Sequence, residues 1–293
     1  MIKSKKTFYT KDFIAEKPMQ LLEYLSVAFQ GKSRSEVKSY LAHRQIAVNG
    51  KCCTAFDFAL QKGDAVRFSS VGEEKPNPNH KCSIVYEDAD ILIVNKKYGV
   101  LSMSTGQDGE TTAYSLMTEH VRRRGKDNRI FIVHRLDRET SGLLMFAKNA
   151  RAQEILQTNW NENVISRKYA AVVEGKVEQD SGQIVSWLTE NRKSFKMNSS
   201  STDNGGQKAV THYKTIQRGE KFSLLELELE TGRKNQIRVQ LASILHPIAG
   251  DKKYGAQSNP LKRICLHART LSFFHPVTRQ KMSFDAGVPK EFL

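Results

Sequence analysis

The sequence predicts an α+β protein in which a large domain, dominated by a mixed or antiparallel sheet, follows a small α+β domain. Segments with the alternation or apolar runs of strands recur through residues 83–293, whereas candidate helices are few there. Strands and helices do not alternate, so a doubly wound parallel sheet is excluded. Residues 71–82 concentrate Gly, Pro, Asn and charge, as an interdomain linker does. We therefore predict a first domain at 1–70 and a second at 83–293.

The charge of the chain indicates a polyanionic partner. Among 293 residues, 46 Lys and Arg outnumber 31 Asp and Glu, which gives a net charge of +15 and favours nucleic acid over a merely basic surface. No apolar run approaches the roughly 20 residues that span a bilayer, and the first residues lack the apolar core of a secretory signal. We expect a cytoplasmic protein with no membrane partner. The four cysteines include no C-x-x-C pair, which predicts reduced thiols and no metal site.

Two helices are predicted in the first domain. Residues 17–30 carry apolar side chains on one helical face, with Pro18 at the position where a helix start tolerates proline. In residues 33–45, Ser33 and Glu36 form the reciprocal capping pattern that opens a helix. Both helices are expected to pack by one apolar face.

Two strands complete the first domain, at residues 46–51, which enter a turn at Asn49-Gly50, and at residues 65–70. With VNG at the first turn and GDAVRF near the end, this unit resembles the S4 RNA-binding domain. Basic residues left on or near the outer helix face are the expected RNA contacts, which would bind phosphates without reading sequence: Arg34, Lys38 and Arg44. A small solvated helical hairpin is the competing interpretation.

The second domain is predicted to consist mainly of strands. A strand, an acidic turn and an apolar strand occupy residues 83–99. Further strands are predicted at 130–136, 142–149, 168–177, 211–218 and 222–230, and helices at 111–124, 149–160 and 235–244. Residues 191–208, rich in Ser, Asn, Lys and Gly, are predicted to form an exposed loop or hairpin tip that could lie against RNA.

A polar segment between the strands predicted at 130–136 and 142–149 is a candidate catalytic loop. Asp137 lies there between Arg135 and Arg138. An ion pair alone would explain a lone Asp in such a place. The surrounding pattern is much longer, however, since HRLDRETSGLLMFAK closely resembles the catalytic segment of the RluA-type pseudouridine synthases.

Three more segments resemble that family in order and spacing. They are LIVNKKYGVLSMST, RKYAAVVEG and TGRKNQIRVQLASILHPIAGDKKYG, followed by the similar block LHARTLSFFHPVTRQ. The resemblance runs from about residue 84 to the C-terminus. It implies an RNA-modifying enzyme that isomerises uridine to pseudouridine.

The resemblance implies that Asp137 is the nucleophile, with Arg238 as the guanidinium that keeps it charged and fixed. The reaction must break the C1′–N1 bond, turn the uracil and rejoin it through C5. A carboxylate can attack C1′, stabilise a cationic sugar or add to C6, and the sequence does not choose among these. Tyr169 matches the active-site tyrosine of the family, whose ring can stack on uracil and whose hydroxyl can assist proton removal.

Other residues of the family motifs are expected to bind the RNA. A target uridine is expected to flip out of its stack, and Arg135 could fill the vacated space. His134 is expected to order the loop, because the isomerisation needs no net proton change. The remaining candidates are Arg138 and Arg233, which could hold phosphates, and Gln236.

The chain departs from the family pattern at three positions. Asn235 and Gln240 stand where the family usually has His, and Lys97 stands where it usually has Pro. The two substitutes for His retain hydrogen-bonding ability. These departures bear on the substrate subgroup more than on catalysis.

No phosphate-binding loop, dinucleotide fingerprint or metal-ligand cluster is recognisable, so no cofactor is expected. The expected partner is RNA, with ribosomal RNA ahead of tRNA, and the expected state is a monomer. One alternative is a non-catalytic RNA-binding or ribosome-assembly factor, against which the intact Asp137 argues. Another is a carboxylate-dependent glycosidase, which would call for a second catalytic acid.

Overall fold

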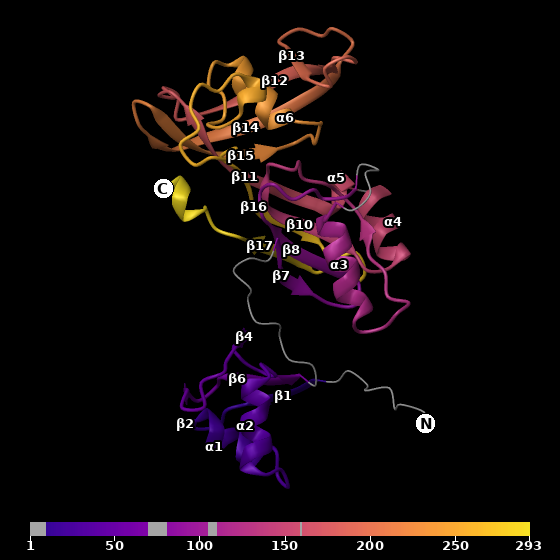
Figure 1. Ribbon diagram of the computed structural model, residues 1–293, viewed down its shortest axis with the longest axis vertical. Helices are drawn as coiled ribbons and strands as arrows, with labels where there is room; N and C mark the ends of the chain where they lie inside the picture. The colour runs from indigo at the N-terminus through magenta and orange to yellow at the C-terminus, as the bar shows by residue number, and fades with distance from the viewer. Residues whose placement is uncertain (1–9, 70–80, 105–109, 159) are drawn as a thin grey trace. The chain divides into compact units, whose positions relative to one another are not determined.

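The computed structural model describes residues 10–69, 81–104, 110–158 and 160–293. The chain divides into two compact units, Met1–Asn79 and His80–Leu293, and Figure 1 shows the elements of each. Most of the linker predicted at 71–82 lies outside the described residues. Its last residue, Cys82, begins a strand instead.

The first unit is a small α+β structure. Its elements are β1 (Thr10–Ile14), β2 (Met19–Gln20), α1 (Leu21–Ala28), α2 (Arg34–Ala42), β3 (Ile46–Val48), β4 (Lys51–Cys52), β5 (Ala59–Leu60) and β6 (Ala65–Ser69). Four strands form a sheet in the order β1-β6-β3-β4, and β2 pairs with β5. The apolar faces of α1 and α2 pack into one core with β3 and β6.

Local sequence signals in the first unit are confirmed with one exception. Ser33 and Glu36 form the capping box of α2, and Asn49 and Gly50 both have positive φ in the turn between β3 and β4, as a two-residue hairpin requires. The helix predicted to begin near Pro18 begins only at Leu21. The prediction was wrong because Met19 and Gln20 pair with β5 as a strand.

The second unit contains one large mixed sheet. Its strands are β7 (Cys82–Glu87), β8 (Ile91–Lys96), β9 (Phe131–Ile132), β10 (Ser141–Ala147), β11 (Val164–Glu174), β12 (Ser181–Glu190), β13 (Met197–Ser200), β14 (Gln207–Arg218), β15 (Phe222–Leu229), β16 (Leu266–Phe274) and β17 (Lys281–Asp285). The order is β13-β12-β14-β15-β11-β16-β10-β8-β7, with β17 on β16 and β9 on β10. Among the pairings of the described strands, β10 with β16 is parallel and the others are antiparallel.

The helices of the second unit lie along this sheet (Figure 1). They are α3 (Ala113–Arg122), α4 (Ala150–Thr158), α5 (Trp160–Asn163) and α6 (Gln236–Ser243), with short 3-10 turns η1 (Lys252–Tyr254) and η2 (Lys290–Phe292). α4 contacts β9 and β10, whereas α6 contacts β12 and β13. No helix of the described residues is long and apolar enough to cross a membrane.

The centre of the sheet is buried on both faces. All seven residues of β10 are buried, and their side chains alternate between two cores. Leu144 and Phe146 join the core under α3, while Leu143 and Met145 join the core under α4. The continuous apolar run in the sequence is therefore a strand covered on both sides.

The predicted α+β class is confirmed, while some elements differ from the predicted ones. The strand predicted at 130–136 is reduced to the two residues of β9, because the following residues form the loop of Asp137. The predicted loop 191–208 contains β13 and the start of β14. Strands β12, β16 and β17 were not predicted from the sequence.

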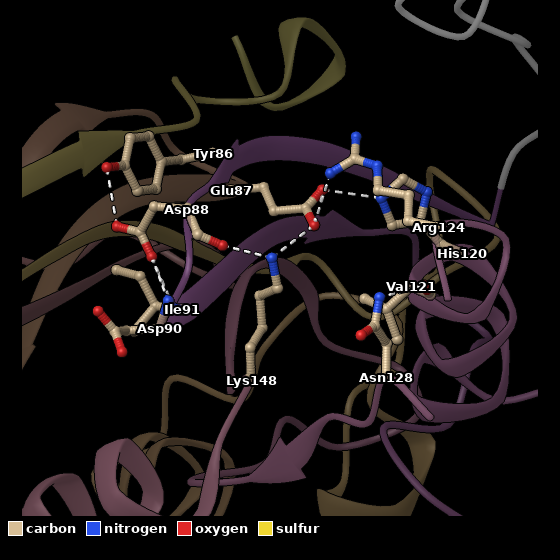
Figure 2. Close-up of polar contacts among 10 residues, drawn as sticks. All are labelled: Tyr86, Glu87, Asp88, Asp90, Ile91, His120, Val121, Arg124, Asn128 and Lys148. Atoms are coloured by element: carbon tan, nitrogen blue, oxygen red, sulfur yellow. Dashed lines mark hydrogen bonds and ion pairs between the residues drawn. The ribbon is translucent and has the colours of Figure 1, made fainter. Parts of the chain in front are cut away.

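A buried carboxylate ties α3 and β10 to the edge of the sheet, as Figure 2 shows. Glu87 ends β7 and contacts His120 and Lys148 at 2.8 Å and Arg124 at 3.0 Å. Burial raises the pKa of Glu87, but the hydrogen bonds and charges of these groups outweigh burial and lower the pKa to about 2. The carboxylate is therefore ionised wherever the unit is folded near neutral pH.

The four cysteines carry reduced thiols, as the sequence predicts. Cys52 and Cys53 belong to the first unit and are partly exposed. Cys82 and Cys265 belong to the second unit and are buried, and burial raises the pKa of each thiol to about 11. The two pairs thus differ in exposure.

Candidate active site

The loop that carries Asp137 is held by its neighbours on both sides. The side chain of Leu136 is buried in the core under α3. The hydroxyl of Ser102 donates to the Leu136 carbonyl at 2.7 Å and accepts from the Leu136 N–H at 3.0 Å. After Asp137 the chain turns, with the Thr140 N–H donating to the Asp137 carbonyl at 3.1 Å. The backbone at Asp137 is therefore fixed before any substrate arrives.

Lys96 supports the other side of the same loop. Its side chain is fully buried, and its ammonium donates to the carbonyls of Val100 at 2.8 Å, Lys97 at 3.1 Å and Arg138 at 3.2 Å. All three N–H donors of the Lys96 ammonium are therefore used in hydrogen bonds to the backbone. Burial lowers the pKa of Lys96 to about 8, with the charge of Asp137 among the groups that oppose this change.

Asp137 opens onto a cavity of about 550 Å³, a size that suits a small ligand or a nucleotide. The cavity collects side chains from the Asp137 loop, β11 and the segment leading into α6. The predicted site residues among its lining are His134, Arg135, Asp137, Tyr169, Arg233, Gln236 and Arg238. Arg138 points elsewhere and forms an ion pair with Glu110.

Arg238 bridges two carboxylates. Its Nη1 lies 3.8 Å from Asp137 Oδ2, which is an ion-pair distance and too long for a hydrogen bond. Its Nε and Nη2 donate to the two oxygens of Asp251 at 2.6 and 2.8 Å. Burial lowers the pKa of Arg238, but Asp251 outweighs burial and the pKa is raised. Asp251 is fully buried, so it fixes the guanidinium that faces Asp137.

The sequence did not single out Asp251. It lies in the quoted motif HPIAGDKKYG, but a single Asp after Gly250 carries no signal of its partner. Its pairing depends on the turn that leads from α6 to η1. The aromatic ring of Tyr254 completes the environment, since its centroid lies 5.1 Å from the Arg238 guanidinium carbon.

Asn235 and Gln240, which stand where the family usually has His, both form hydrogen bonds within the fold. Asn235 adopts a left-handed conformation before α6, donates to the Tyr254 hydroxyl at 3.0 Å and accepts from Arg238 at 3.3 Å. Gln240 is fully buried and donates to the Ile184 carbonyl and two other acceptors of β12 and β14. Both amides therefore position α6.

Gln236 has the same kind of structural role. Its amide nitrogen donates to the Val210 carbonyl and the Thr211 hydroxyl, and its oxygen accepts from Thr231 and the Arg233 N–H. The side chain is buried and its polar atoms are used within the fold. The prediction that Gln236 binds substrate is therefore corrected, because the geometry makes it a positioning residue.

Tyr169 lies on β11, where the pairing with β16 is irregular between Lys168 and Tyr169. The ring packs against the cores on either side of the β11–β16 junction. Burial raises the pKa of the Tyr169 phenol, the charge of Arg167 opposes this, and the charge of Asp137 adds to it. The phenol therefore stays protonated at neutral pH.

The remaining predicted residues differ in their contacts. The Nε2 atom of His134 accepts a hydrogen bond from the Met145 N–H at 3.0 Å, and its ring centroid lies 5.1 Å from that of Trp160. Burial lowers the pKa of His134 to about 3, so the ring is neutral. Arg135 is exposed, and Arg233 donates to the Lys208 carbonyl at 3.3 Å.

Arg167 and Trp160 are among the cavity residues that were not predicted from the sequence. The guanidinium carbon of Arg167 lies 5.7 Å from the Trp160 ring centroid. Arg167 lies in the quoted segment RKYAAVVEG, two residues before Tyr169. Strand alternation could have assigned it to the same face as Tyr169.

In the first unit, the predicted RNA-contacting residues lie on and after α2. Arg34 and Lys38 are exposed, and the Lys38 ammonium lies 5.7 Å from the Phe56 ring centroid. Arg44 is half-buried and has a φ of 58°. The exposed side of α2 is thus cationic, while Val37 and Leu41 face the core.

Asp88, Asp90 and His275 bring three potential metal ligands within 4.8 Å of one another. Asp88 accepts hydrogen bonds from the Tyr86 hydroxyl at 2.9 Å and from the Ile91 N–H at 2.8 Å, and Figure 2 shows both. It also contacts Nε2 of His275 at 3.1 Å. These bonds give the cluster a structural role at the turn between β7 and β8.

Comparisons with known proteins agree with this architecture. Residues 90–243 match the family model described as RNA pseudouridylate synthase. The chain is 36% identical over 266 residues to an uncharacterized RNA pseudouridine synthase, YhcT, of Bacillus subtilis, covering 88% of this chain and 86% of that protein. It is 30% identical over 291 residues to ribosomal large subunit pseudouridine synthase D of Escherichia coli, covering 94% and 88%.

A solved structure shares the fold. The structure of human RNA pseudouridylate synthase domain containing 4 superposes with a TM-score of 0.59 at 22% identity, covering 72% of this chain and 90% of that one. The family model, the curated relatives and the arrangement of the cavity point to one assignment. The chain belongs to the RluA-type family of RNA pseudouridine synthases.

Proposed function

We propose that this chain isomerises specific uridines of ribosomal RNA to pseudouridine, with the carboxylate of Asp137 as the nucleophile. The observation that carries the proposal is the meeting of Asp137, Tyr169 and Arg238 at one cavity, although they come from separate elements of the chain. A nucleophile, an aromatic platform and a fixed cation are the groups that this chemistry needs.

The reaction exchanges one bond to the sugar for another. The C1′–N1 bond breaks, uracil turns, and a C1′–C5 bond forms while C5 loses its proton and N1 gains one. Asp137 acts by attack at C1′ or at C6, and the carboxylate is released when the product forms. Its side chain is 27% exposed, which leaves it accessible, and Arg238 holds the carboxylate on one side.

Tyr169 is assigned to stacking on the uracil ring and to holding a proton. Its raised pKa keeps the phenol protonated, so the hydroxyl acts as a hydrogen-bonding group and does not itself remove the C5 proton, a step that would need a phenolate. Its place on the cavity wall allows the ring to lie against a flipped base.

Arg135 is assigned to the space that the flipped uridine leaves in the RNA. It is exposed at the cavity that contains Asp137, and its planar guanidinium can stack between bases. Flipping costs a few kcal/mol, which contacts in the cavity must offset. Arg233 uses its Nε to donate to the Lys208 carbonyl, and its two Nη groups are assigned to a phosphate of the RNA. Arg138 is bound to Glu110, which makes it the weaker phosphate contact.

The proposed substrate class rests on the relatives and on the first unit. The Escherichia coli relative is named for the large ribosomal subunit. The exposed Arg34 and Lys38 of α2, with Arg44, support an S4-like role in holding structured RNA by its phosphates. That the chain acts as a cytoplasmic monomer, and without a cofactor, stays a prediction.

The test is a transcriptome-wide pseudouridine map of cells with and without this chain. Sites lost from ribosomal RNA would support the proposal, and sites lost from tRNA would correct the substrate class. An unchanged map would favour a non-catalytic RNA-binding factor. Asp137→Asn should restore no site while retaining RNA binding, since the fold does not depend on that charge. Full activity of this variant would refute the nucleophile.

A further inference from the structure

We propose that Arg167 binds a backbone phosphate of the RNA beside the target uridine, in a position built by Trp160 and Gly232. This rests on the proposed function, since it takes the cavity of Asp137 as the place where uridine enters. It adds a phosphate contact inside the cavity, distinct from the exposed arginines at its mouth.

The side chain of Arg167 is directed into the cavity without a protein partner. Within the described residues its guanidinium has no hydrogen-bond acceptor and no carboxylate at ion-pair distance. The guanidinium lies over the face of the Trp160 ring. Other arginines near the site are paired, Arg238 with Asp251 and Arg138 with Glu110. Arg135 is exposed, so water solvates it.

Arg167 cannot rely on water to the same extent. Burial lowers the pKa of its guanidinium, which records the loss of solvation around a group that nonetheless stays charged. A desolvated charge without an ion-pair partner is unfavourable in the free protein. An anion that enters the cavity would remove that penalty on binding.

The chemistry of the substrate identifies the anion. Uracil and ribose are neutral, whereas each nucleotide carries a phosphodiester. A guanidinium presents a planar fork of donors that matches two phosphate oxygens. Arg238 is committed to carboxylates. Arg233 is exposed, whereas Arg167 is partly buried, so Arg167 is assigned the phosphate contact inside the cavity.

The surroundings hold the guanidinium in place. Trp160 supports one face of it, and the ring of Trp160 is itself in contact with His134. On another side lies Gly232, where an added Cβ would be 2.8 Å from Arg167 Nη1. Glycine at 232 therefore leaves the room that the guanidinium occupies.

The experiment uses the full chain and RNA purified from cells that lack it. Initial rates of pseudouridine formation are measured against RNA and NaCl concentration for wild type, Arg167→Met and Arg167→Lys. Lys221→Gln is the control, because it removes one exposed charge from the β14–β15 turn. Gly232→Ala displaces the guanidinium without removing it.

Arg167→Met should raise KM about tenfold or more while kcat changes little. The slope of log(kcat/KM) against log[NaCl] should become shallower by about 0.7 to 0.9, as loss of one phosphate contact predicts. Arg167→Lys should keep the wild-type slope with a smaller rise in KM. Gly232→Ala should raise KM, and Lys221→Gln should match wild type.

Thermal unfolding of the free protein separates this role from a structural one. Arg167→Met should unfold at or above the wild-type temperature, because it removes an unpaired, partly buried charge. A lower unfolding temperature with an unchanged salt slope would overturn the proposal. An inactive wild type would instead refute the proposed function, so the two failures are distinguishable.

Discussion

Replacing Gly142 with Ala should destabilise the second unit through a clash with the backbone of Ala268. Gly142 has a φ of +112°, and a Cβ there would lie 2.6 Å from the nitrogen and 2.7 Å from the carbonyl carbon of Ala268. Backbone atoms cannot swing away as a side chain can. The strained φ costs about 1 to 2 kcal/mol and the overpacking about 1 to 3 kcal/mol, so we expect a loss of about 3 kcal/mol.

The clash lies where β10 and β16 pair in parallel, with Gly142 opposite Ala268. Ala268 is also paired with Tyr169 of β11. A displacement of Ala268 is therefore transmitted to the cavity wall, and we expect lower activity even at temperatures where the variant is folded.

Gly205→Ala is the matched control. Gly205 belongs to the same unit and has a φ of +77°, but nothing lies within 4 Å of its added Cβ. At about 2 to 4 °C per kcal/mol for a domain of this size, Gly142→Ala should lower Tm by about 6 to 12 °C, whereas Gly205→Ala, with only the φ strain of about 1 to 2 kcal/mol, should lower it by about 2 to 8 °C. Equal losses of Tm in the two variants would refute the clash and leave only backbone strain.

Two further predictions concern buried carboxylates. Asp251→Asn should lower kcat on the order of 10²-fold with little change in KM, because Arg238 would no longer be fixed toward Asp137. Single-turnover rates measure this loss, and a variant that reacts at the wild-type rate would contradict the role of Asp251. Glu87→Gln should lower the free energy of unfolding by about 3 kcal/mol at pH 7. Since the pKa of Glu87 is lowered to about 2, its contribution is complete above its unfolded pKa and is lost as pH falls toward 2. Urea unfolding should therefore show a smaller difference in the free energy of unfolding between variant and wild type at pH 3 than at pH 7. The same difference at both pH values would contradict a stabilising role for the ionised Glu87.

Features that depend on neighbours in the chain could be predicted from the sequence. The capping box of Ser33 and Glu36 and the hairpin turn at Asn49-Gly50 are decided within a few residues. The apolar run of β10 is long enough to demand burial on both faces. Asp137 was recognisable because a whole motif surrounds it.

Features that depend on contacts across the fold could not be predicted. Asp251 binds Arg238 only because a turn brings two segments together, and no spacing in the sequence encodes that geometry. Gln236 was assigned to substrate because a motif gives the residue type but not the partners of its amide. Pro18 suggested a helix start, whereas pairing with a distant strand delayed the helix to Leu21.

The distribution of thiols makes the natural chain suitable for selective labelling. The thiolate is the form that reacts with maleimides, and the buried Cys82 and Cys265 have pKa values raised to about 11. Cys52 and Cys53 are partly exposed and both belong to the first unit. A fluorophore can therefore be attached to the first unit without a substitution, and its signal would follow how that unit engages RNA while the catalytic unit stays unmodified.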